Sequence, residues 1–275
     1  FNTVVVQLAN GLNLDSFPVA PHKDAWDKAA FSEWLEYAKT HGMNVIPEIK
    51  LLSKQNKMLQ KSRPDLMFNG VTYDPRNEEV YEIIFKLIDE LISIMHPTAI
   101  HIGHDEVAGF RPYSAKKYLR SGEVMIPADL FLKDVLLVHY YLSSKSVDTW
   151  MWGDMLIAEE EFSTIPRNKL HGSKPGYGKV LRDQLPRDIV ICDWHYKQDE
   201  TEFPTLSVMQ SEGFRVIGAT FRKEDTIQNF SRYASDHGAY GMMATSWFLV
   251  SRREWDKVDR IISYSGEVFQ KDFLD

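Results

Sequence analysis

Residues 78–107 read EEVYEIIFKLIDELISIMHPTAIHIGHDEV, and this stretch indicates the fold class of the chain. In its first part, apolar residues recur at spacings of three and one, which puts them on one stripe of a helix that faces a sheet. They are Val80, Ile83, Ile84, Leu87, Ile88, Leu91, Ile92 and Met95. Asp74 and Pro75 are typical of a helix start. Residues 99–105 then form an apolar run that predicts a strand, so the stretch combines one helix and one strand of an α/β protein.

Runs of the same two kinds alternate along the rest of the chain. The predicted strands are residues 3–9, 44–49, 99–105, 149–154, 188–194, 215–220 and 240–247. Helices are predicted over residues 26–41, 74–95, 128–143, 203–212, 225–236 and 254–269, and residues 159–187 are expected to be loop with short helical pieces. This alternation predicts parallel strands joined by crossover helices. Because no glycine-rich phosphate turn follows any strand, we expect a (β/α)8 TIM-type barrel and not a doubly wound sheet.

The barrel is expected to be incomplete. A closed barrel has eight strands, whereas the sequence offers seven recognisable β/α units and the first begins at residue 3. We therefore expect residues 1–275 to form a single barrel domain that lacks one unit at its N-terminus. A strand hidden within residues 51–73 or 159–187 is the alternative.

The composition is that of a folded globular protein. Hydrophobic residues make up 44% and charged residues 26% of the 275 residues, a balance that excludes intrinsic disorder. The net charge of −7 and the lack of a long Lys or Arg run argue against nucleic acid as a partner. No run of about 18 apolar residues is present, so the sequence predicts no membrane span. Cys192 is the only cysteine, which excludes an intrachain disulfide and a cysteine-rich metal site.

Two adjacent carboxylic acids, Asp105 and Glu106, come where the strand at residues 99–105 ends. Strand alternation puts the two isoleucines toward the surrounding helices, and His101 and Asp105 toward the barrel interior. In barrel enzymes the C-terminal ends of the strands carry the active site. Repulsion between neighbouring carboxylates, together with partial burial, can keep one of them ionised and the other protonated near neutral pH. The pair therefore suits general acid–base chemistry.

Two other interpretations of this motif are open. An Asp-Glu pair taken alone is most often an exposed acidic loop, and the position at a strand end is what argues against that here. His101, His104, Asp105 and Glu106 could also be metal ligands. The two histidines, however, are three residues apart on a strand and should point to opposite faces, unlike the i, i+4 pair of a helical zinc site. We expect no metal.

Residues 101–107, His-Ile-Gly-His-Asp-Glu-Val, resemble the His-x-Gly-Gly-Asp-Glu signature of the family 20 glycoside hydrolases, the β-N-acetylhexosaminidases, with His104 in place of the second glycine. Residues 37–42 and 45–49 (VIPEI) are similar to the family's third strand and the segment before it. Residues 152–155, Trp-Gly-Asp-Met, resemble the Trp-x-Asp of its fifth strand, and Trp247 closes the last strand. The similarity spans nearly the whole chain, and it implies a barrel catalytic domain that acts on a small-molecule or oligosaccharide substrate.

The resemblance also implies a mechanism in which the substrate supplies its own nucleophile and the configuration is retained. Glu106 would be the general acid that protonates the leaving glycosidic oxygen, and then the base that activates water. Asp105 would orient the 2-acetamido group and stabilise the positive charge that develops as the acetamido oxygen attacks C1. No protein nucleophile, metal or organic cofactor is implied.

Aromatic and polar residues near the predicted strand ends are candidates for substrate binding. Flat apolar rings can wall the sugar face and the acetamido methyl group. His101 is expected to support Asp105 or Glu48 by hydrogen bonding. Asp193, His195 and Tyr196 could hydrogen-bond a sugar or its acetamido carbonyl, or they could cap a loop. The full set of substrate-binding candidates is Trp152, Trp194, Trp247, Asp154, Tyr196, His101 and Glu48.

The chain departs from the family pattern at several positions. Lys50 and Lys54 stand where the family has an Asp and, four residues later, a His. An ammonium group near Glu106 would favour the ionised acid and oppose proton donation, unless both lysines point to solvent. The family's sugar-binding Arg of the first strand is not found, and residues 220–222 replace its Tyr-x-Asp.

Two alternatives to the hydrolase therefore stay open. One is a sugar-binding barrel that has lost turnover. The other is a glycosidase of different specificity, which would pair Glu106 with a second carboxylate. The candidates for that second carboxylate are Asp154, Asp193 and Glu48.

Overall fold

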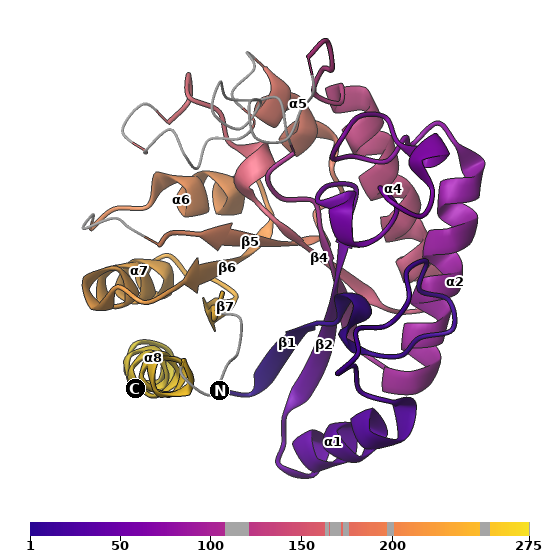
Figure 1. Cartoon of the computed structure of the whole chain (residues 1–275). Coiled ribbons are helices and arrows are strands. Elements are labelled where there is room, and N and C mark those ends of the chain that lie inside the picture. The colour runs from indigo at the N-terminus through magenta and orange to yellow at the C-terminus, as the bar shows by residue number, and fades with distance from the viewer. Residues whose placement is uncertain are drawn as a thin grey trace. The chain divides into compact units, whose positions relative to one another are not determined.

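Within the residues that the structure describes, seven parallel strands alternate with helices, as the sequence predicts (Figure 1). The computed structural model describes residues 1–107, 121–162, 165, 172, 176–196, 201–247 and 254–274. Its strands are β1 (Thr3–Gln7), β2 (Asn44–Leu51), β3 (Ala99–Gly103), β4 (Asp148–Trp152), β5 (Val190–Trp194), β6 (Arg215–Thr220) and β7 (Gly241–Ala244). The α-helices are α1 (Lys28–Thr40), α2 (Glu78–Met95), α4 (Ala128–Ser144), α5 (Tyr177–Gln184), α6 (Pro204–Ser211), α7 (Glu224–Asp236) and α8 (Trp255–Leu274). Short 3-10 helices are η1 (Ala9–Gly11), η2 (Gln55–Lys57), η3 (Pro64–Leu66) and η4 (Asp154–Leu156).

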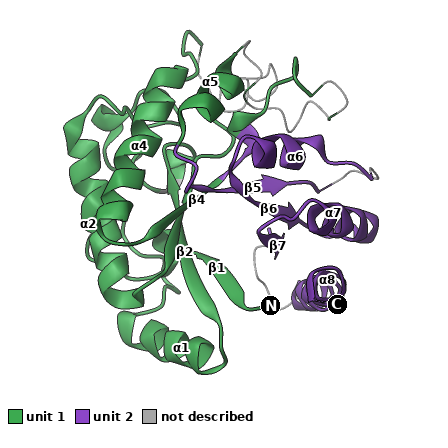
Figure 2. Cartoon of the chain, turned by 180° about the vertical axis from the view of Figure 1, so that it is seen from behind, with its two compact units in different colours: residues 1–151, 155–185 green, residues 152–154, 186–275 purple. Residues whose placement is uncertain are grey.

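The chain divides into two compact units (Figure 2). The first unit comprises residues 1–151 and 155–185, and the second comprises residues 152–154 and 186–275. The first unit therefore contains the strands β1 to β3 and nearly all of β4, whereas the second contains β5 to β7.

Strands of the first unit lie side by side in chain order, and each pair is parallel. Val4 pairs with Val45, Glu48 with His101, and His101 with Trp150. The helices α1, α2 and α4 lie on one face of these strands (Figure 1). Parallel neighbours in sequence order, with the connecting helices on one face, form the arrangement of a (β/α) barrel.

Helix α2 shows why the stretch quoted first folds as predicted. Its buried stripe consists of Val80, Tyr81, Ile84, Leu87, Ile88, Leu91 and Met95. Full burial of an aliphatic side chain of this size stabilises the fold by about 1.5–3 kcal/mol relative to exposure. The helix begins at Glu78, because the side chain of Asn77 caps it by accepting a hydrogen bond from the Glu79 amide. The start predicted at Asp74 was therefore about one turn too early.

A β-bulge in β2 shapes the C-terminal edge of the sheet in the first unit. Between the pairs Glu48 with His101 and Leu51 with Gly103, β2 has two residues and β3 has one. Gly103 lies directly against the bulge, because a Cβ atom there would be 3.1 Å from the carbonyl oxygen of Ile49. The bulge and the strand end next to it therefore require a glycine at this position.

The second unit continues the same pattern. Cys192 of β5 pairs with Ile217 of β6, and Gly218 pairs with Met242 of β7, again in parallel. Helix α7 buries Ile227 and Phe230 on its apolar side. Helices α6, α7 and α8 accompany these strands (Figure 1).

Several element ends differ from the prediction by two or three residues. Strand β3 ends at Gly103, because positive φ angles at Gly103 (78°) and His104 (65°) turn the backbone out of the extended conformation. Strand β7 ends at Ala244 and not at residue 247. Residues 52–73 contain η2, η3 and one isolated bridge but no strand of the sheet. Within residues 159–187 the described residues include α5. Residues 163, 164, 166–171 and 173–175 of this segment lie outside the described residues.

None of the helices in the described ranges combines the length and the apolar composition that crossing a membrane requires.

We predict that Gly103→Ala destabilises the fold more than Gly42→Ala does. Both glycines have positive φ angles, 78° and 76°, so each alanine would adopt the left-handed conformation at a cost of about 1 kcal/mol. Only Gly103 adds a steric conflict, because its Cβ would lie 3.2 Å from the Lys50 Cα, whereas the Cβ at Gly42 would meet nothing within 4 Å. Urea unfolding of both variants should therefore differ by about 1–2 kcal/mol. Equal losses would contradict the close approach of the two strands.

Candidate active site

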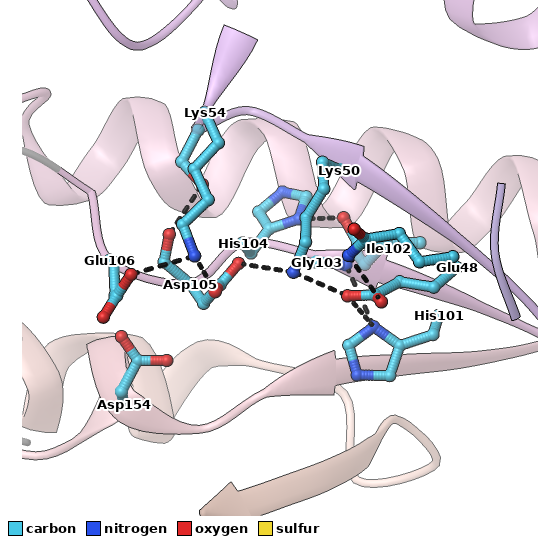
Figure 3. Close-up of polar contacts among 12 residues, drawn as sticks. Glu48, Lys50, Lys54, His101, Ile102, Gly103, His104, Asp105, Glu106 and Asp154 are labelled. Carbon is cyan, nitrogen blue, oxygen red and sulfur yellow. Dashed lines mark hydrogen bonds and ion pairs between the residues drawn. The ribbon is translucent and has the colours of Figure 1, made fainter. Parts of the chain in front are cut away.

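Two lysines and three carboxylates form one ion-pair network at the C-terminal ends of β2 and β3 (Figure 3). The Lys54 ammonium lies 2.5 Å from Asp105 Oδ2 and 2.9 Å from Glu106 Oε2. The Lys50 ammonium lies 3.3 Å from Asp105 Oδ1 and 2.7 Å from Glu48 Oε1. Lys50 and Lys54 therefore approach the acids and do not point to solvent. Three carboxylates and two ammonium groups leave one net negative charge, so the network favours a neutral or cationic ligand over an anionic one.

The two adjacent acids differ in their exposure. The Asp105 side chain is 9% exposed and the Glu106 side chain is 41% exposed. Burial works to raise the pKa of Asp105, but the charges of Lys50 and Lys54 and the hydrogen bond from Lys54 outweigh it, so the pKa lies well below its usual value. Asp105 is therefore a buried, ionised carboxylate, whereas Glu106 can reach a ligand from the surface.

Lys54 is held in the charged form by the same contacts. Burial works to lower the pKa of Lys54, but the charges of Asp105 and Glu106 and their hydrogen bonds raise it well above the usual value for a lysine. An ammonium group this close to both acids attracts their ionised forms. Proton donation by Glu106 therefore requires its ion pair with Lys54 to open.

Glu48 and His101 support the network from the strands behind it. Burial works to raise the pKa of Glu48, but Lys50 and His101 lower it below the usual value, and the Gln7 side chain donates a hydrogen bond of 3.0 Å to its Oε2. His101 Nδ1 lies 3.8 Å from Glu48 Oε1 and accepts a hydrogen bond of 3.2 Å from the Gly103 amide. Burial lowers the pKa of His101 to about 4, so its ring is neutral near pH 7. His101 thus lies next to Glu48, but 3.8 Å is too long for a hydrogen bond, so the predicted support of Glu48 by hydrogen bonding stays a prediction.

The segment that carries the two acids has an unusual backbone. Gly103, His104 and Glu106 all have positive φ angles, of 78°, 65° and 49°. For residues other than glycine this conformation costs about 1–3 kcal/mol each and persists only where the surroundings fix it. The Ser53 hydroxyl donates a 2.6 Å hydrogen bond to the Asp105 carbonyl oxygen. The His104 ring points into the core, where its Nε2 lies 2.8 Å from Asp134 Oδ2.

The two histidines of the motif therefore contact different partners: His101 lies next to Glu48 and His104 next to Asp134. This agrees with the expectation that their side chains point to opposite faces.

The second unit gathers the other predicted substrate-binding residues. Trp152 ends β4 and lies 5.7 Å from the Trp247 ring, measured between ring centroids. Trp194 ends β5, stacks on Tyr196 at 4.9 Å, and its Nε1 donates a 3.3 Å hydrogen bond to Asp154 Oδ1. Trp152 and Asp154 are buried, whereas Trp247 is 44% exposed. The aromatic cluster, namely Trp152, Trp194, Tyr196 and Trp247, thus stands at or just beyond strand ends within one unit.

Asp193 and His195 do not present free polar groups to a sugar. Both are buried, and the Thr205 hydroxyl donates a 2.6 Å hydrogen bond to Asp193 Oδ2 and lies 2.9 Å from His195 Nε2. The His195 ring is also packed edge-on against Phe203 and Phe230. These two residues form part of the core of the second unit.

Sequence reasoning did not find Asp134, Tyr73, Tyr81 and Ser53. Asp134 is fully buried on α4 and accepts hydrogen bonds from Tyr73 (2.9 Å) and Tyr81 (2.8 Å). The sequence does contain a signal for Asp134, because this acid lies on the apolar face of α4. Its neighbours on that face are Phe131, Val135 and Val138. A lone acid on such a face needs partners, and tyrosine hydroxyls are among the few that can supply them.

Comparison with known proteins identifies the family. A family model described as glycosyl hydrolase family 20, catalytic domain, matches residues 12–223. The chain belongs to glycosyl hydrolase family 20. The resemblance inferred from the His-x-Gly-x-Asp-Glu motif is therefore confirmed.

Individual members of family 20 are similar to this chain over part of their length. A probable beta-hexosaminidase of Arthroderma benhamiae is 25% identical over 237 residues, which cover 75% of this chain and 34% of that protein. The structure of a Flavobacterium johnsoniae chitobiase has a TM-score of 0.63 at 14% identity, covering 98% of this chain and 46% of that chain. The exo β-N-acetylglucosaminidase of Vibrio harveyi, solved with N-acetylglucosamine, has the same TM-score and identity, covering 98% of this chain and 49% of that one. The chain thus spans about a third to a half of the length of these relatives.

These structures confirm the predicted fold class. The described residues carry seven parallel strands with helices between them, and this arrangement is that of an incomplete (β/α)8 barrel of family 20. The expectation that residues 1–275 act as one catalytic domain stays a prediction.

We predict that His101 makes the folded chain less stable as the pH falls from about 6.5 to about 4. The unfolded chain protonates this histidine near the usual value of 6.5, but the folded chain does so only at about 4, so the unfolded chain binds more protons between these pH values. The loss corresponds to roughly 3 kcal/mol. It should be largely absent in His101→Gln, and it should remain in His22→Gln, a change at an exposed histidine. Urea unfolding at the two pH values measures it, and an equal loss in wild type and His101→Gln would contradict burial as a neutral ring.

Proposed function

We propose that the chain is a glycoside hydrolase that removes terminal β-linked N-acetylhexosamine by a substrate-assisted, retaining mechanism. The observation that carries this proposal is the division between the two neighbouring acids. Asp105 is buried and held ionised by two ammonium groups, while Glu106 is 41% exposed at the same strand end. Family 20 membership and the hexosaminidase relatives support the same reaction.

Glu106 is the general acid and base of the proposed reaction. In the first step the acetamido oxygen of the substrate forms a bond to C1 while the bond from C1 to the leaving oxygen breaks, and that oxygen takes the proton of Glu106. In the second step the Glu106 carboxylate accepts a proton from water while the water oxygen forms a bond to C1 and the bond from C1 to the acetamido oxygen breaks, which restores the acetamido group and the protonated Glu106. Each atom comes from substrate, water or Glu106, so no protein nucleophile, metal ion or organic cofactor is needed.

Asp105 supplies the negative charge that the first step requires. As the acetamido oxygen attacks C1, positive charge develops on the acetamido group. An ionised carboxylate accepts a hydrogen bond from the acetamido N–H and stabilises this charge. Lys50 and Lys54 take one contact on each Asp105 oxygen. A carboxylate has about four acceptor positions, so capacity for a substrate N–H remains. Because the Asp105 side chain is largely shielded from solvent, its interaction with the acetamido charge is stronger there than in water.

The aromatic cluster is proposed as a sugar-binding surface of the second unit. Trp152, Trp194, Tyr196 and Trp247 offer ring faces at strand ends, and Asp154 receives the Trp194 indole hydrogen bond that fixes one of them. Rings of this kind bind the apolar face of a sugar and its methyl substituent. His101 and Glu48 act from behind the acids, through the Glu48 ion pair with Lys50.

One observation favours a second candidate, a sugar-binding protein with little or no turnover. Lys54 bridges Asp105 and Glu106, and an ion pair on the general acid opposes proton donation. Calorimetry with an N-acetylhexosamine thiazoline, a mimic of the cyclic intermediate, separates the two candidates. A hydrolase should bind the thiazoline at least about 100-fold more tightly than the plain sugar, whereas equal or weaker thiazoline binding would favour the binding protein.

We predict that Glu106→Gln and Asp105→Asn each abolish most of the hydrolysis of a chromogenic N-acetyl-β-glucosaminide and its galacto epimer. Removing the general acid should lower kcat about 10²- to 10⁴-fold, and removing the acetamido stabiliser should lower it about 10²- to 10³-fold. Glu36→Gln, at an exposed position of α1, is the matched control and should leave kcat unchanged. If the wild type hydrolyses neither substrate, the proposed reaction is wrong.

We also predict that Lys54→Met raises kcat, because the variant no longer holds Glu106 in an ion pair that opposes proton donation. The hydrolysis of a chromogenic N-acetyl-β-glucosaminide at about pH 7, compared between wild type and variant, measures this. Lys23→Met, at a lysine that is 83% exposed, is the control and should leave kcat unchanged. A lower kcat in Lys54→Met would mean that the ammonium assists the reaction instead of opposing it.

A further inference from the structure

The turn that carries the two acids is held by His104. Its backbone has a φ angle of 65°, which favours glycine, and the family signature that this chain resembles has a glycine at that position. The residues on either side of Asp105 are both left-handed and neither is glycine. Contacts of the His104 side chain must therefore offset the cost of this backbone conformation, which a glycine would adopt without strain.

The His104 ring is fully buried, and both of its nitrogens contact oxygen atoms. Nδ1 lies 3.0 Å from the carbonyl oxygen of Ile102, and Nε2 lies 2.8 Å from Asp134 Oδ2. The ring is therefore held at both nitrogens, and its edge-on contact with Phe131, at 5.4 Å between ring centroids, fixes its plane.

Asp134 is anchored in turn by two phenols. Tyr73 donates a 2.9 Å hydrogen bond to Oδ2, and Tyr81 donates one of 2.8 Å to Oδ1. Burial and the Asp134 charge raise the pKa values of both tyrosines far above their usual range, which keeps the phenols protonated as donors. Asp134, on α4, thus contacts Tyr81 of α2, Tyr73 of the segment before α2 and His104 of the turn after β3. These contacts connect the turn to both flanking helices of the first unit.

We propose that His104 is a positioning residue of the hydrolase: its ring, hydrogen-bonded to Asp134, holds the left-handed turn at residues 103–106 and thereby fixes where Asp105 and Glu106 point. This inference rests on the proposed function for its consequence in catalysis. Besides the two lysines on its acids, the turn is held by the contact of His104 with Asp134 and by the hydrogen bond from the Ser53 hydroxyl to the Asp105 carbonyl oxygen.

A double-mutant cycle tests the tether. His104→Asn keeps a residue that tolerates a positive φ angle but loses the ring, and Asp134→Asn keeps the shape but loses the charge. Each single variant should lower kcat about 10- to 100-fold while KM changes little, because misplacement of the acids impairs the reaction more than ground-state binding. The double variant should lose no more than the worse single one, since both changes break one contact. Ile84→Val, a buried change on α2 away from the turn, is the control for general loss of stability and should keep kcat.

Hydrogen exchange supplies a readout that is independent of activity. The amides of residues 105–107 should exchange at least about 10-fold faster in His104→Asn and in Asp134→Asn than in wild type, and Ile84→Val should leave them unchanged. Unaltered exchange in both tether variants, or kcat values within about threefold of wild type, would overturn the proposal. If the wild type has no hydrolase activity, the proposed function fails, and the exchange rates alone decide whether His104 holds the turn.

Discussion

A buried carboxylate next to the end of a parallel strand is stable only if cations or donors satisfy it, and in this chain two ammonium groups do so for Asp105. Removing an ion of this kind from water costs several kcal/mol, which the attraction to a close partner has to offset. Lys50 and Lys54 lie on different oxygens of Asp105, and they come from the end of the neighbouring strand and the loop that follows it. The register of β2 against β3 therefore determines whether the acid can be buried at all.

That register depends on backbone features of a few residues. The bulge in β2 brings its chain against Gly103, where a side chain would collide with the Ile49 carbonyl oxygen. Past this glycine the chain turns through left-handed residues, so that Asp105 remains buried while Glu106 reaches the surface. The buried pair of His104 and Asp134 holds the same turn from the side of the core. Fold and chemistry are thus coupled through one short segment, whose sequence has little freedom to vary.

Much of the fold could be predicted from the sequence, because periodicity reports burial directly. The stripe on α2 and the apolar runs of β2 and β3 gave the alternating elements, and the Asp-Glu motif gave the family. The predicted ends of β3 and β7 lie two or three residues beyond the observed ends. For β3 the reason is the positive φ angle at His104, which a pattern of side chains does not reveal. The sequence also left open where Lys50 and Lys54 point, because lysine side chains are usually solvated and a sequence pattern does not show the bulge that lies between Glu48 and Leu51.

The most direct measurement of the central claim is a crystal structure of the chain with a bound N-acetylhexosamine thiazoline. We expect the ring nitrogen of the ligand at hydrogen-bond distance from the Asp105 carboxylate, about 2.7–3.2 Å. We also expect the Lys54 ammonium to have moved beyond about 4 Å from Glu106, the limit of an ion pair. A ligand bound away from Asp105, with Lys54 still bridging both acids, would contradict the account.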